Sequence, residues 1–316
     1  MSELRIQNIS KNYGQVQAVK NLSLSVEKGE VFGLLGHNGA GKTTTIECIL
    51  GIKKTDSGTV SLLGMEPNQN RKELFSRVGV QFQESAYQER IKVHELCGLF
   101  TALYANPLSY KELLAEFGLM EKEKAYVSSL SGGQRQKLTV VLALIPDPEI
   151  LFLDELTTGL DPQARREMWA YIRKLKEMGK TIFMTTHYME EAEILCDRVG
   201  LMRKGELTAL GSPRELVDSC KLDHHITITT DHENLDFLKE MQGVREVRKL
   251  QDAVEIRTSP DTSLLAVIRN LDERKINIYT LNMRTPNLDD AYLHLAGINT
   301  DGIEIGNSDN MQGARK

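Results

Sequence analysis

A glycine-rich segment at residues 36–43 directly follows an apolar run at residues 30–35. It reads GHNGAGKT and matches G-x-x-x-x-G-K-[ST], a pattern whose glycines let successive backbone N–H groups face phosphate oxygens. The helix expected to begin near Lys42 points the positive end of its dipole at the same charge. An ordinary glycine-rich turn is the alternative, but here a strand precedes the loop and helix-forming residues follow it. The sequence therefore predicts an α/β fold with a phosphate-binding loop between a buried strand and a helix.

Individual positions in and before this loop have predicted contacts with a nucleotide. Lys42 would reach the β- and γ-phosphates, and the Thr43 hydroxyl would bind Mg²⁺. The other predicted nucleotide-binding residues of the segment are Gly36, His37, Asn38, Gly39, Ala40, Gly41 and Thr44. Tyr13, ahead of the phosphate-binding strand, can stack on a nucleotide base or pack at a strand end, and the residues alone leave both roles open.

Polar side chains follow two further apolar runs. The run at residues 150–153 is typical of a parallel strand buried on both faces, and it ends in Asp154 and Glu155. In phosphate-loop enzymes the first such acid holds Mg²⁺ and the second polarises the attacking water, and the alternative is a solvated strand end. A strand at residues 181–186 ends at His187. The carboxyl end of a core strand is where ligands bind in open α/β sheets, which favours a functional role for this histidine.

Between Val93 and Met120 the apolar residues change to helical spacing, which indicates a helical insertion. The insertion closes at residues 131–134, Ser-Gly-Gly-Gln, which open a helix at residues 135–144. A plain helix start is one interpretation of this segment. A second anion site is the other, because the open N–H groups of a helix start can also face a γ-phosphate.

Six motifs together resemble the signature of the ATP-binding-cassette ATPases. They occur in the order typical of that family and span roughly residues 4–218: GHNGAGKT, Gln83, LSGGQ at 130–134, LFLDE at 151–155, GLD at 159–161 and His187. The resemblance implies a P-loop NTPase core with antiparallel β and helical subdomains. It also implies hydrolysis of ATP with Mg²⁺.

The resemblance also implies roles for individual residues. Tyr13 would stack on adenine, and Gln83 would sense the γ-phosphate and the metal. Glu155 would be the general base, and His187 would contact the γ-phosphate. The implied metal ligands are Thr43, Gln83 and Asp154. In this family two nucleotide domains dimerise head to tail, so that the LSGGQ segment of one closes over ATP held by the other. The remaining predicted nucleotide-binding residues are Ser131, Gly132, Gly133, Gln134 and Asp161.

One residue departs from the family pattern, and one segment refines the resemblance. Leu156 stands where the family usually has proline after the glutamate, and we expect at most a change in loop rigidity. The stretch at residues 285–295, TPNLDDAYLHL, resembles the end of ATPases from the drug and antibiotic exporter branch of the daunorubicin-resistance type. This resemblance favours an exporter over a solute importer.

A polar stretch at residues 218–223 predicts a domain boundary. We expect an ATP-binding domain at residues 1–219, with a helical subdomain at about 84–145, and a smaller α+β domain at 220–297. The predicted elements of the smaller domain are strands at 225–229, 244–250, 253–258 and 276–282 and helices at 233–241 and 263–272. Their order, β-α-β-β-α-β, is that of the split βαβ or ferredoxin-like fold. Residues 298–316 are rich in Asn, Asp and Gly and are expected to be disordered.

The net charge and the distribution of apolar residues limit which classes of partner the chain can have. Its 39 basic and 44 acidic residues give a formal net charge of -5, which argues against a nucleic-acid partner. No run reaches the roughly 18 apolar residues of a membrane span, and the N-terminus has no signal-peptide pattern. The cysteines are scattered, as in proteins of a reducing cytosol: Cys48, Cys97, Cys196 and Cys220. We expect a cytoplasmic protein held at the inner face of the membrane by a separate permease, with a second ATP-binding subunit as homodimer or heterodimer.

Three other classes share parts of this pattern. Cassette proteins that act on ribosomes carry two cassettes in one chain, whereas this sequence has one phosphate loop. DNA-repair ATPases split the cassette with heptad coiled coils, and no sustained a/d pattern is present. The class of GTPase switch proteins is not supported, because the sequence contains no N-K-x-D motif. The sequence therefore favours the ATPase subunit of an exporter.

Overall fold

The computed structural model describes residues 2–83, 87–88, 90–232 and 234–295. It divides into two compact units, residues 1–213 (unit 1) and 214–316 (unit 2). The tail expected to be disordered, residues 298–316, lies outside the described residues. Within the described ranges, no helix combines the length and the apolar character needed to cross a bilayer.

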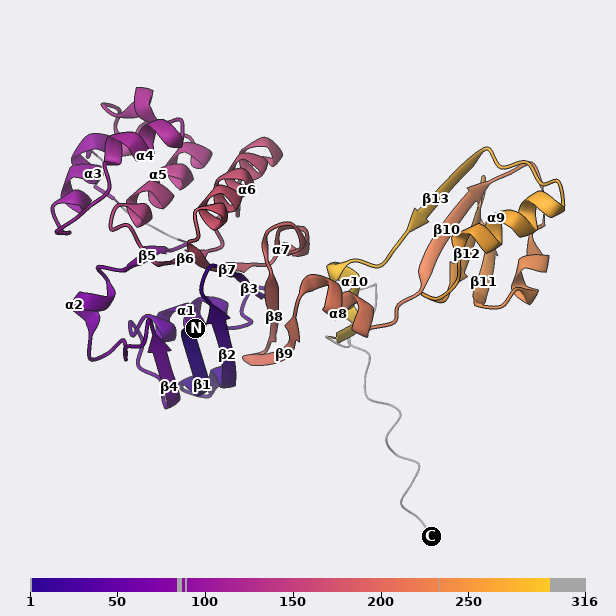
Figure 1. Ribbon diagram of the computed structural model, residues 1–316, viewed down its shortest axis with the longest axis horizontal. Coiled ribbons are helices and arrows are strands. Elements are labelled where there is room, and N and C mark those ends of the chain that lie inside the picture. The colour runs from indigo at the N-terminus through magenta and orange to yellow at the C-terminus, as the bar shows by residue number, and fades with distance from the viewer. Residues whose placement is uncertain (1, 84–86, 89, 233, 296–316) are drawn as a thin grey trace, which may run out of the picture. The chain divides into compact units, whose positions relative to one another are not determined.

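The centre of unit 1 is a six-stranded sheet with the strand order β5-β6-β7-β3-β8-β9 (Figure 1). Neighbouring strands from β5 to β8 are parallel, and β9 pairs antiparallel with β8. Every residue of β3, β6 and β7 is buried, as expected for parallel strands covered on both faces. The strands are β3 (Val31–Leu35), β5 (Val78–Gln81), β6 (Ile150–Asp154), β7 (Thr181–Thr186), β8 (Arg198–Arg203) and β9 (Glu206–Gly211).

A second sheet of unit 1 has three antiparallel strands in the order β2-β1-β4. They are β1 (Ser2–Tyr13), β2 (Val16–Glu27) and β4 (Ser57–Leu62). Their apolar residues pack in one hydrophobic cluster with Phe32, Phe152 and Phe183 of the six-stranded sheet. The ring centroids of Phe32 and Phe152 lie 5.5 and 5.4 Å from that of Phe183. Burial of these rings joins the two sheets into one core.

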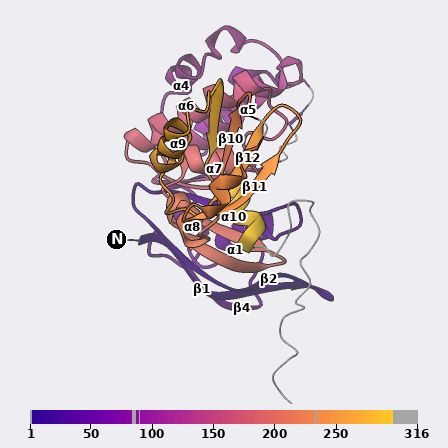
Figure 2. The ribbon, with the colours of Figure 1, turned by 90° about the vertical axis from the view of Figure 1, so that its right-hand side faces the viewer.

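Helices form the described chain between β5 and β6. They are α3 (Val93–Thr101), α4 (Tyr110–Glu116) and α5 (Gly132–Leu144), with 3₁₀ turns at Met120–Lys122 and Val127–Ser129. Figures 1 and 2 show these helices and the three-stranded sheet on opposite sides of the six-stranded sheet. The other helices of unit 1 are α1 (Lys42–Ile49), α2 (Arg71–Leu74), α6 (Pro162–Glu177) and α7 (Met189–Leu195).

The sequence did not predict the hairpin that closes the edge of the six-stranded sheet. Strands β8 and β9 are joined by Lys204 and Gly205, which have φ angles of 47° and 85°. Two successive residues with positive φ are typical of a tight β-hairpin turn. This turn brings a cation to the edge of the sheet.

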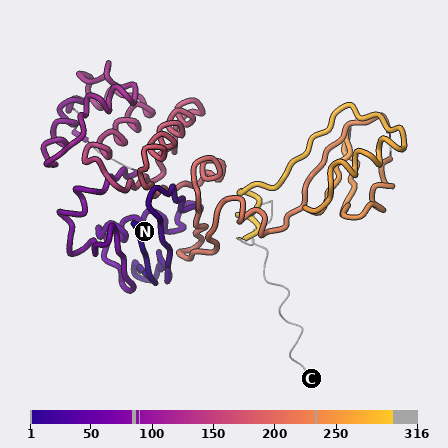
Figure 3. The backbone as a smooth tube through the Cα atoms, in the orientation of Figure 1, coloured from indigo at the N-terminus to yellow at the C-terminus, as the bar shows by residue number. Residues whose placement is uncertain are grey.

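Unit 2 is built on a four-stranded antiparallel sheet with the order β11-β12-β10-β13. Its strands are β10 (His224–Thr229), β11 (Val244–Lys249), β12 (Val254–Thr258) and β13 (Thr280–Arg284). Helix α9 (Leu264–Glu273) and a 3₁₀ turn at Asp236–Glu240 pack apolar side chains against this sheet. Figure 3 traces the chain from α8 (Pro213–Ser219) into β10 and from β13 into α10 (Leu288–Leu295).

Two predictions for unit 2 are wrong. The sequence predicts an α-helix at residues 233–241, but the structure has a 3₁₀ turn at Asp236–Glu240. Leu235 and Leu238 are both buried and lie three residues apart, a spacing that suits three residues per turn. The last strand begins at Thr280 instead of Ile276, and Ile276 packs into the core of the unit from the segment between α9 and β13.

Candidate functional site

The loop at residues 36–41 joins the end of β3 to the start of α1. Gly41, the residue before the helix, has a φ of 106°, where a side chain would be strained. A Cβ on Gly41 would also collide with the carbonyl oxygen of Ala18, and one on Gly36 with that of Met202. No described side chain caps the N-terminus of α1. The N–H groups of its first turn are therefore available to an anion.

Lys42 is buried at the start of α1, with 4% of its side chain exposed. Its Nζ donates hydrogen bonds to the carbonyl oxygens of Gly36, at 2.7 Å, and His37, at 3.2 Å. The same Nζ lies 3.1 Å from Oε1 of Glu155. The ammonium group of Lys42 thus contacts both the loop and the end of β6.

Three predicted catalytic residues meet at Glu155. Its Oε2 accepts a hydrogen bond from Nε2 of Gln83 at 3.2 Å and lies 3.5 Å from Nδ1 of His187. Glu155 has a φ of 48°, a left-handed conformation that is uncommon outside glycine. Its backbone N–H donates to the carbonyl and hydroxyl oxygens of Thr185, at 3.2 and 3.1 Å, which holds this conformation in place. Strained backbone of this kind clusters at functional sites.

Asp154 is fully buried beside Thr43. Burial raises the pKa of its carboxyl above the usual value, although the nearby hydroxyls of Thr185 and Thr43 act in the opposite direction. Its Oδ1 accepts from Thr185 at 2.5 Å, but its Oδ2 is buried without a partner among the described residues. A carboxylate oxygen left unpaired beside a hydroxyl matches the oxygen ligands that Mg²⁺ prefers.

A cavity of about 790 Å³ lies over the phosphate loop. Its described walls come from the turn between β1 and β2, from the start of β2, from the loop and from the segments that follow β5, β6 and β8. Eight predicted site residues line it: Asn38, Gly39, Gly41, Lys42, Thr43, Thr44, Gln83 and Glu155. Five predicted residues of the loop or of the segments that contact its walls are not among the described lining residues: Gly36, His37, Ala40, Asp154 and His187. The other predicted residues that do not line the cavity are Tyr13, the LSGGQ segment and Asp161.

Several wall residues were missed by sequence reasoning. They are residues 15–18 and Lys20 after the first turn, and Lys204 in the β8–β9 hairpin. The basic turn Arg203-Lys204-Gly205 after a buried strand was the available signal for Lys204. Tyr13 lies just before these residues, is 43% exposed and has Nζ of Lys11 at 5.5 Å from its ring centroid. It is absent from the described walls of the cavity.

The LSGGQ segment and Asp161 form helix caps away from this cavity. Ser131 and Gln134 make a reciprocal capping box at the start of α5, with N–H to side-chain distances of 3.2 and 3.1 Å. The carboxylate of Asp161 caps α6, accepting from the N–H groups of Gln163 and Ala164. Neither segment appears in the described walls of the cavity. The described walls of the cavity over Lys42 are thus formed without the LSGGQ segment of the same chain.

Glu191 on α7 is a further residue that sequence reasoning missed. Its side chain is fully buried, and its Oε1 accepts from the hydroxyl of Thr157 at 2.8 Å and from Nε1 of Trp169 at 3.0 Å. Thr157 lies two residues after Glu155. Glu191 thus anchors the loop that follows the end of β6 to helix α6.

Comparison with known proteins shows which family has a similar sequence. A family model described as ABC transporter matches residues 19–158. The linearmycin resistance ATP-binding protein LnrL of Bacillus subtilis (strain 168) is 34% identical over 310 residues, which cover 93% of this chain and 98% of LnrL. The chain belongs to the ATP-binding proteins of ABC transporters.

Other members of this ABC family match about two thirds of the chain. The Nod factor export ATP-binding protein I of Burkholderia orbicola (strain AU 1054) is 43% identical over 224 residues, 69% of this chain and 74% of that protein. A solved ATP-binding subunit of an ABC transporter has a TM-score of 0.63 at 26% identity, covering 69% of this chain and 93% of its own. The ADP conformation of another ABC cassette has a TM-score of 0.61 at 26% identity, covering 68% and 92%. This chain is therefore an ABC ATPase that binds ATP and has the P-loop NTPase fold.

Proposed function

We propose that this ABC ATPase powers an exporter whose membrane permease is a separate polypeptide. The observation that carries the proposal is the match with LnrL, which covers 93% of the chain and therefore extends through most of unit 2. The Nod factor export protein and the solved cassettes cover about two thirds of the chain. Unit 2 is thus shared with a relative whose name refers to resistance against an antibiotic.

In the proposed site, Lys42 and the backbone of the phosphate loop hold the β- and γ-phosphates. Thr43, Asp154 and Gln83 are the proposed Mg²⁺ ligands, supported by the unpaired Oδ2 of Asp154 beside the Thr43 hydroxyl. When bound, Mg²⁺ neutralises charge on the phosphate oxygens. Tyr13 is the proposed platform for adenine.

Glu155 is the proposed general base, with Gln83 and His187 holding its carboxylate. Its Oε1 is paired with Lys42, the same ammonium that the γ-phosphate needs. A γ-phosphate would compete with Glu155 for Lys42, because both are anions within reach of one cation. Nucleotide entry would therefore release the Glu155 carboxylate to accept a proton from the attacking water.

We propose that a second ATP-binding subunit completes the site, as homodimer or heterodimer. The Ser131–Gln134 cap and Asp161 lie at the N-termini of α5 and α6, and neither is part of the described walls of its own chain's cavity. A partner subunit in head-to-tail orientation would supply these groups to ATP on Lys42.

A second cavity in unit 1 is the proposed contact for the permease. It measures about 350 Å³ and lies between β5 and the helices that follow it. Its aromatic wall residues are Phe75, Phe82, Tyr87, Phe100 and Tyr104. Phe82 directly precedes Gln83, whose amide holds Glu155. An apolar helix face of the permease seated here would therefore act on the segment that carries Gln83.

We further propose that residues 220–297 form an accessory domain of the split βαβ type, following an ATP-binding domain at 1–219 with a helical subdomain at about 84–145. The antiparallel sheet order β11-β12-β10-β13 supports this assignment. Attachment to the permease would place the chain at the cytoplasmic face of the membrane. No nucleic-acid partner is proposed.

Deletion of the gene in the source organism, with complementation, tests the exporter proposal. We expect the deletion strain to become sensitive to at least one amphipathic antibiotic and to retain more of it inside the cell. Wild-type protein should restore efflux, Glu155→Gln should not, and Glu190→Gln, on the exposed face of α7, should. Efflux that is unchanged across a broad panel of compounds, with import of a solute lost instead, would overturn the proposal.

A further inference from the structure

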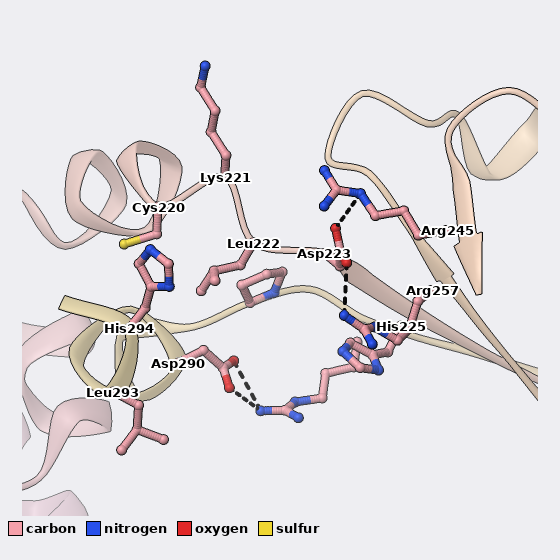
Figure 4. Close-up of a pocket in the computed structure, with 12 residues that line it drawn as sticks. Cys220, Lys221, Leu222, Asp223, His225, Arg245, Arg257, Asp290, Leu293 and His294 are labelled. Carbon is pink, nitrogen blue, oxygen red and sulfur yellow. Dashed lines mark hydrogen bonds and ion pairs between the residues drawn. The ribbon is translucent and has the colours of Figure 1, made fainter. Parts of the chain in front are cut away.

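Unit 2 contains a cavity that the nucleotide chemistry does not use. It has a volume of about 510 Å³, within the range of small-molecule sites. Figure 4 shows Arg245, Arg257 and His225 on its sheet side and His294 and Leu293 on its α10 side. Because its described walls all belong to unit 2, the argument for this cavity uses unit 2 alone.

A cross-strand row of side chains forms the sheet side of this cavity. Arg257 of β12 and Arg284 of β13 both lie directly opposite His225 of β10. Directly opposite residues share one face of a sheet, and like charges in such positions destabilise it. Glu246, opposite Arg257, and Glu255, 3.1 Å from Nδ1 of His225, offset the charge of this row, so the row gathers guanidinium N–H donors on one face of the sheet.

Carboxylates hold the arginines of the cavity in position. Asp223, which is 9% exposed, lies 3.1 Å from both Nε of Arg245 and Nη2 of Arg257. Asp290 of α10 accepts from Nη2 of Arg284 at 2.8 and 3.0 Å. Each arginine of the cavity thus has a carboxylate partner, and what it offers a ligand is the N–H donors that these pairs leave over.

One buried donor in this cluster also lacks an acceptor. Arg257 donates through Nη1 to Glu246 at 2.8 Å and through Nη2 to Asp223 at 3.1 Å. Its Nε is buried and has no hydrogen-bond partner among the described residues. A buried donor without an acceptor is costly, so an anion that reaches this guanidinium would be favoured.

The remaining walls are apolar. Leu222, Pro286 and Leu293 line the cavity, and its described walls include no Phe, Tyr or Trp ring. A nucleotide base would therefore find no aromatic platform here. The combination of unused guanidinium donors, including the buried Nε of Arg257, and aliphatic walls suits a ligand with an anionic head and an aliphatic body.

We propose that this cavity binds a small organic anion with an aliphatic chain, of the class of medium-chain carboxylates. Its carboxylate pairs with Arg257 and Arg284, and its chain lies against Leu222, Pro286 and Leu293. The ligand would join the sheet of unit 2 to α10. This site is a property of unit 2 and stands or falls independently of the proposed exporter function.

Isothermal titration calorimetry of the full chain with sodium decanoate, below its micelle concentration, tests the proposal. We expect one saturable site per chain. Decyltrimethylammonium, which has the same chain and the opposite charge, and sodium phosphate, which has no chain, should each bind at least about tenfold more weakly. Absence of saturable decanoate binding, or equal binding of either comparison probe, would overturn the proposal.

Variants locate the binding in this cavity. Arg284→Gln should weaken decanoate binding about tenfold, because it removes a charge-assisted hydrogen bond. Arg245→Gln leaves the Arg284–Asp290 pair intact and should weaken binding about threefold, so the proposal remains testable if Arg284→Gln loosens α10. Arg248→Gln is the matched control, since it removes an exposed arginine of β11 outside the cavity. A loss of affinity in Arg248→Gln equal to that in Arg245→Gln, with both variants melting like wild type, would contradict the assignment.

Discussion

Nζ of Lys42 lies 3.1 Å from Oε1 of Glu155, and neither side chain is more than 6% exposed. These residues carry the two central proposed roles, phosphate binding and activation of water. A buried ion pair of this kind costs little while both partners are present, but removal of one leaves an uncompensated charge. The pair therefore couples the stability of unit 1 to the chemistry of its site.

Lys42→Ala is expected to weaken ATP binding and to lower the free energy of unfolding by about 3 kcal/mol, because Glu155 is left buried without its cation. Adding Glu155→Gln should recover part of the stability but not the binding. Urea unfolding and titration with a fluorescent ATP analogue measure the two effects, with the exposed Lys54→Ala as control. Unchanged ATP affinity in Lys42→Ala would rule out the phosphate-loop assignment.

Tyr13→Ala is expected to lower ATP affinity about tenfold, since stacking of a base on an aromatic ring contributes roughly 1–3 kcal/mol. Tyr126→Ala is a matched control, because Tyr126 is also exposed and also has a lysine over its ring. Equilibrium binding of the fluorescent analogue compares them. Equal affinity in Tyr13→Ala and wild type would assign Tyr13 to packing at the strand end.

Glu191→Gln is expected to stabilise the protein at neutral pH. Burial raises the pKa of the Glu191 carboxyl, although hydrogen bonds from Thr186, Thr157 and Trp169 lower it. Between the usual Glu pKa of about 4.3 and the raised pKa, the folded chain binds a proton that the unfolded chain has lost. The free energy of unfolding therefore falls as pH rises through this window.

Urea unfolding of wild type and Glu191→Gln across this pH range checks whether the free energy of unfolding changes with pH in the predicted direction. The variant cannot ionise, so its advantage should grow as pH rises through the window and vanish below about pH 4. Glu190→Gln, with an exposed carboxylate, should show no such pH-dependent difference. A variant that is less stable than wild type at pH 7 would show that the ionised carboxylate is favoured in the folded chain.

Ser131→Arg tests the need for a second subunit. In a Glu155→Gln background, where ATP is not consumed, the added Ser131→Arg should retain ATP binding but abolish ATP-dependent dimerisation. Sizing chromatography with ATP at high protein concentration measures the dimer. Ser109→Arg, which alters the N-cap of α4, is the matched control and should still dimerise. An ATP-dependent dimer of equal strength in the Ser131→Arg protein would show that the LSGGQ segment is only the start of a helix.

The sequence predicted the parts of unit 1 that follow local rules. The buried runs became β3, β6 and β7, and the loop between β3 and α1 begins and ends at glycines that its backbone requires. The carboxyl-end rule for parallel strands likewise favoured a functional role for His187, whose Nδ1 lies 3.5 Å from Oε2 of Glu155.

Features that depend on long-range packing were not accessible in this way. Lys204 reaches the nucleotide cavity only because the β8–β9 hairpin turns back at the sheet edge. No motif includes Glu191, yet packing of α6 against α7 buries its carboxylate on Thr157 and Trp169. The ion pair between Lys42 and Glu155 likewise joins residues more than a hundred positions apart, and no spacing in the sequence indicates it.

Steady-state phosphate release by wild-type protein and by Glu155→Gln tests the central claim most directly. Because an amide cannot accept a proton from water, we expect release to fall at least about a hundredfold in the variant. ATP affinity should be retained or increased, since Lys42 no longer has a competing carboxylate. Glu190→Gln should hydrolyse ATP at the wild-type rate. Turnover by Glu155→Gln within a few-fold of wild type would contradict the assignment of Glu155 as the general base.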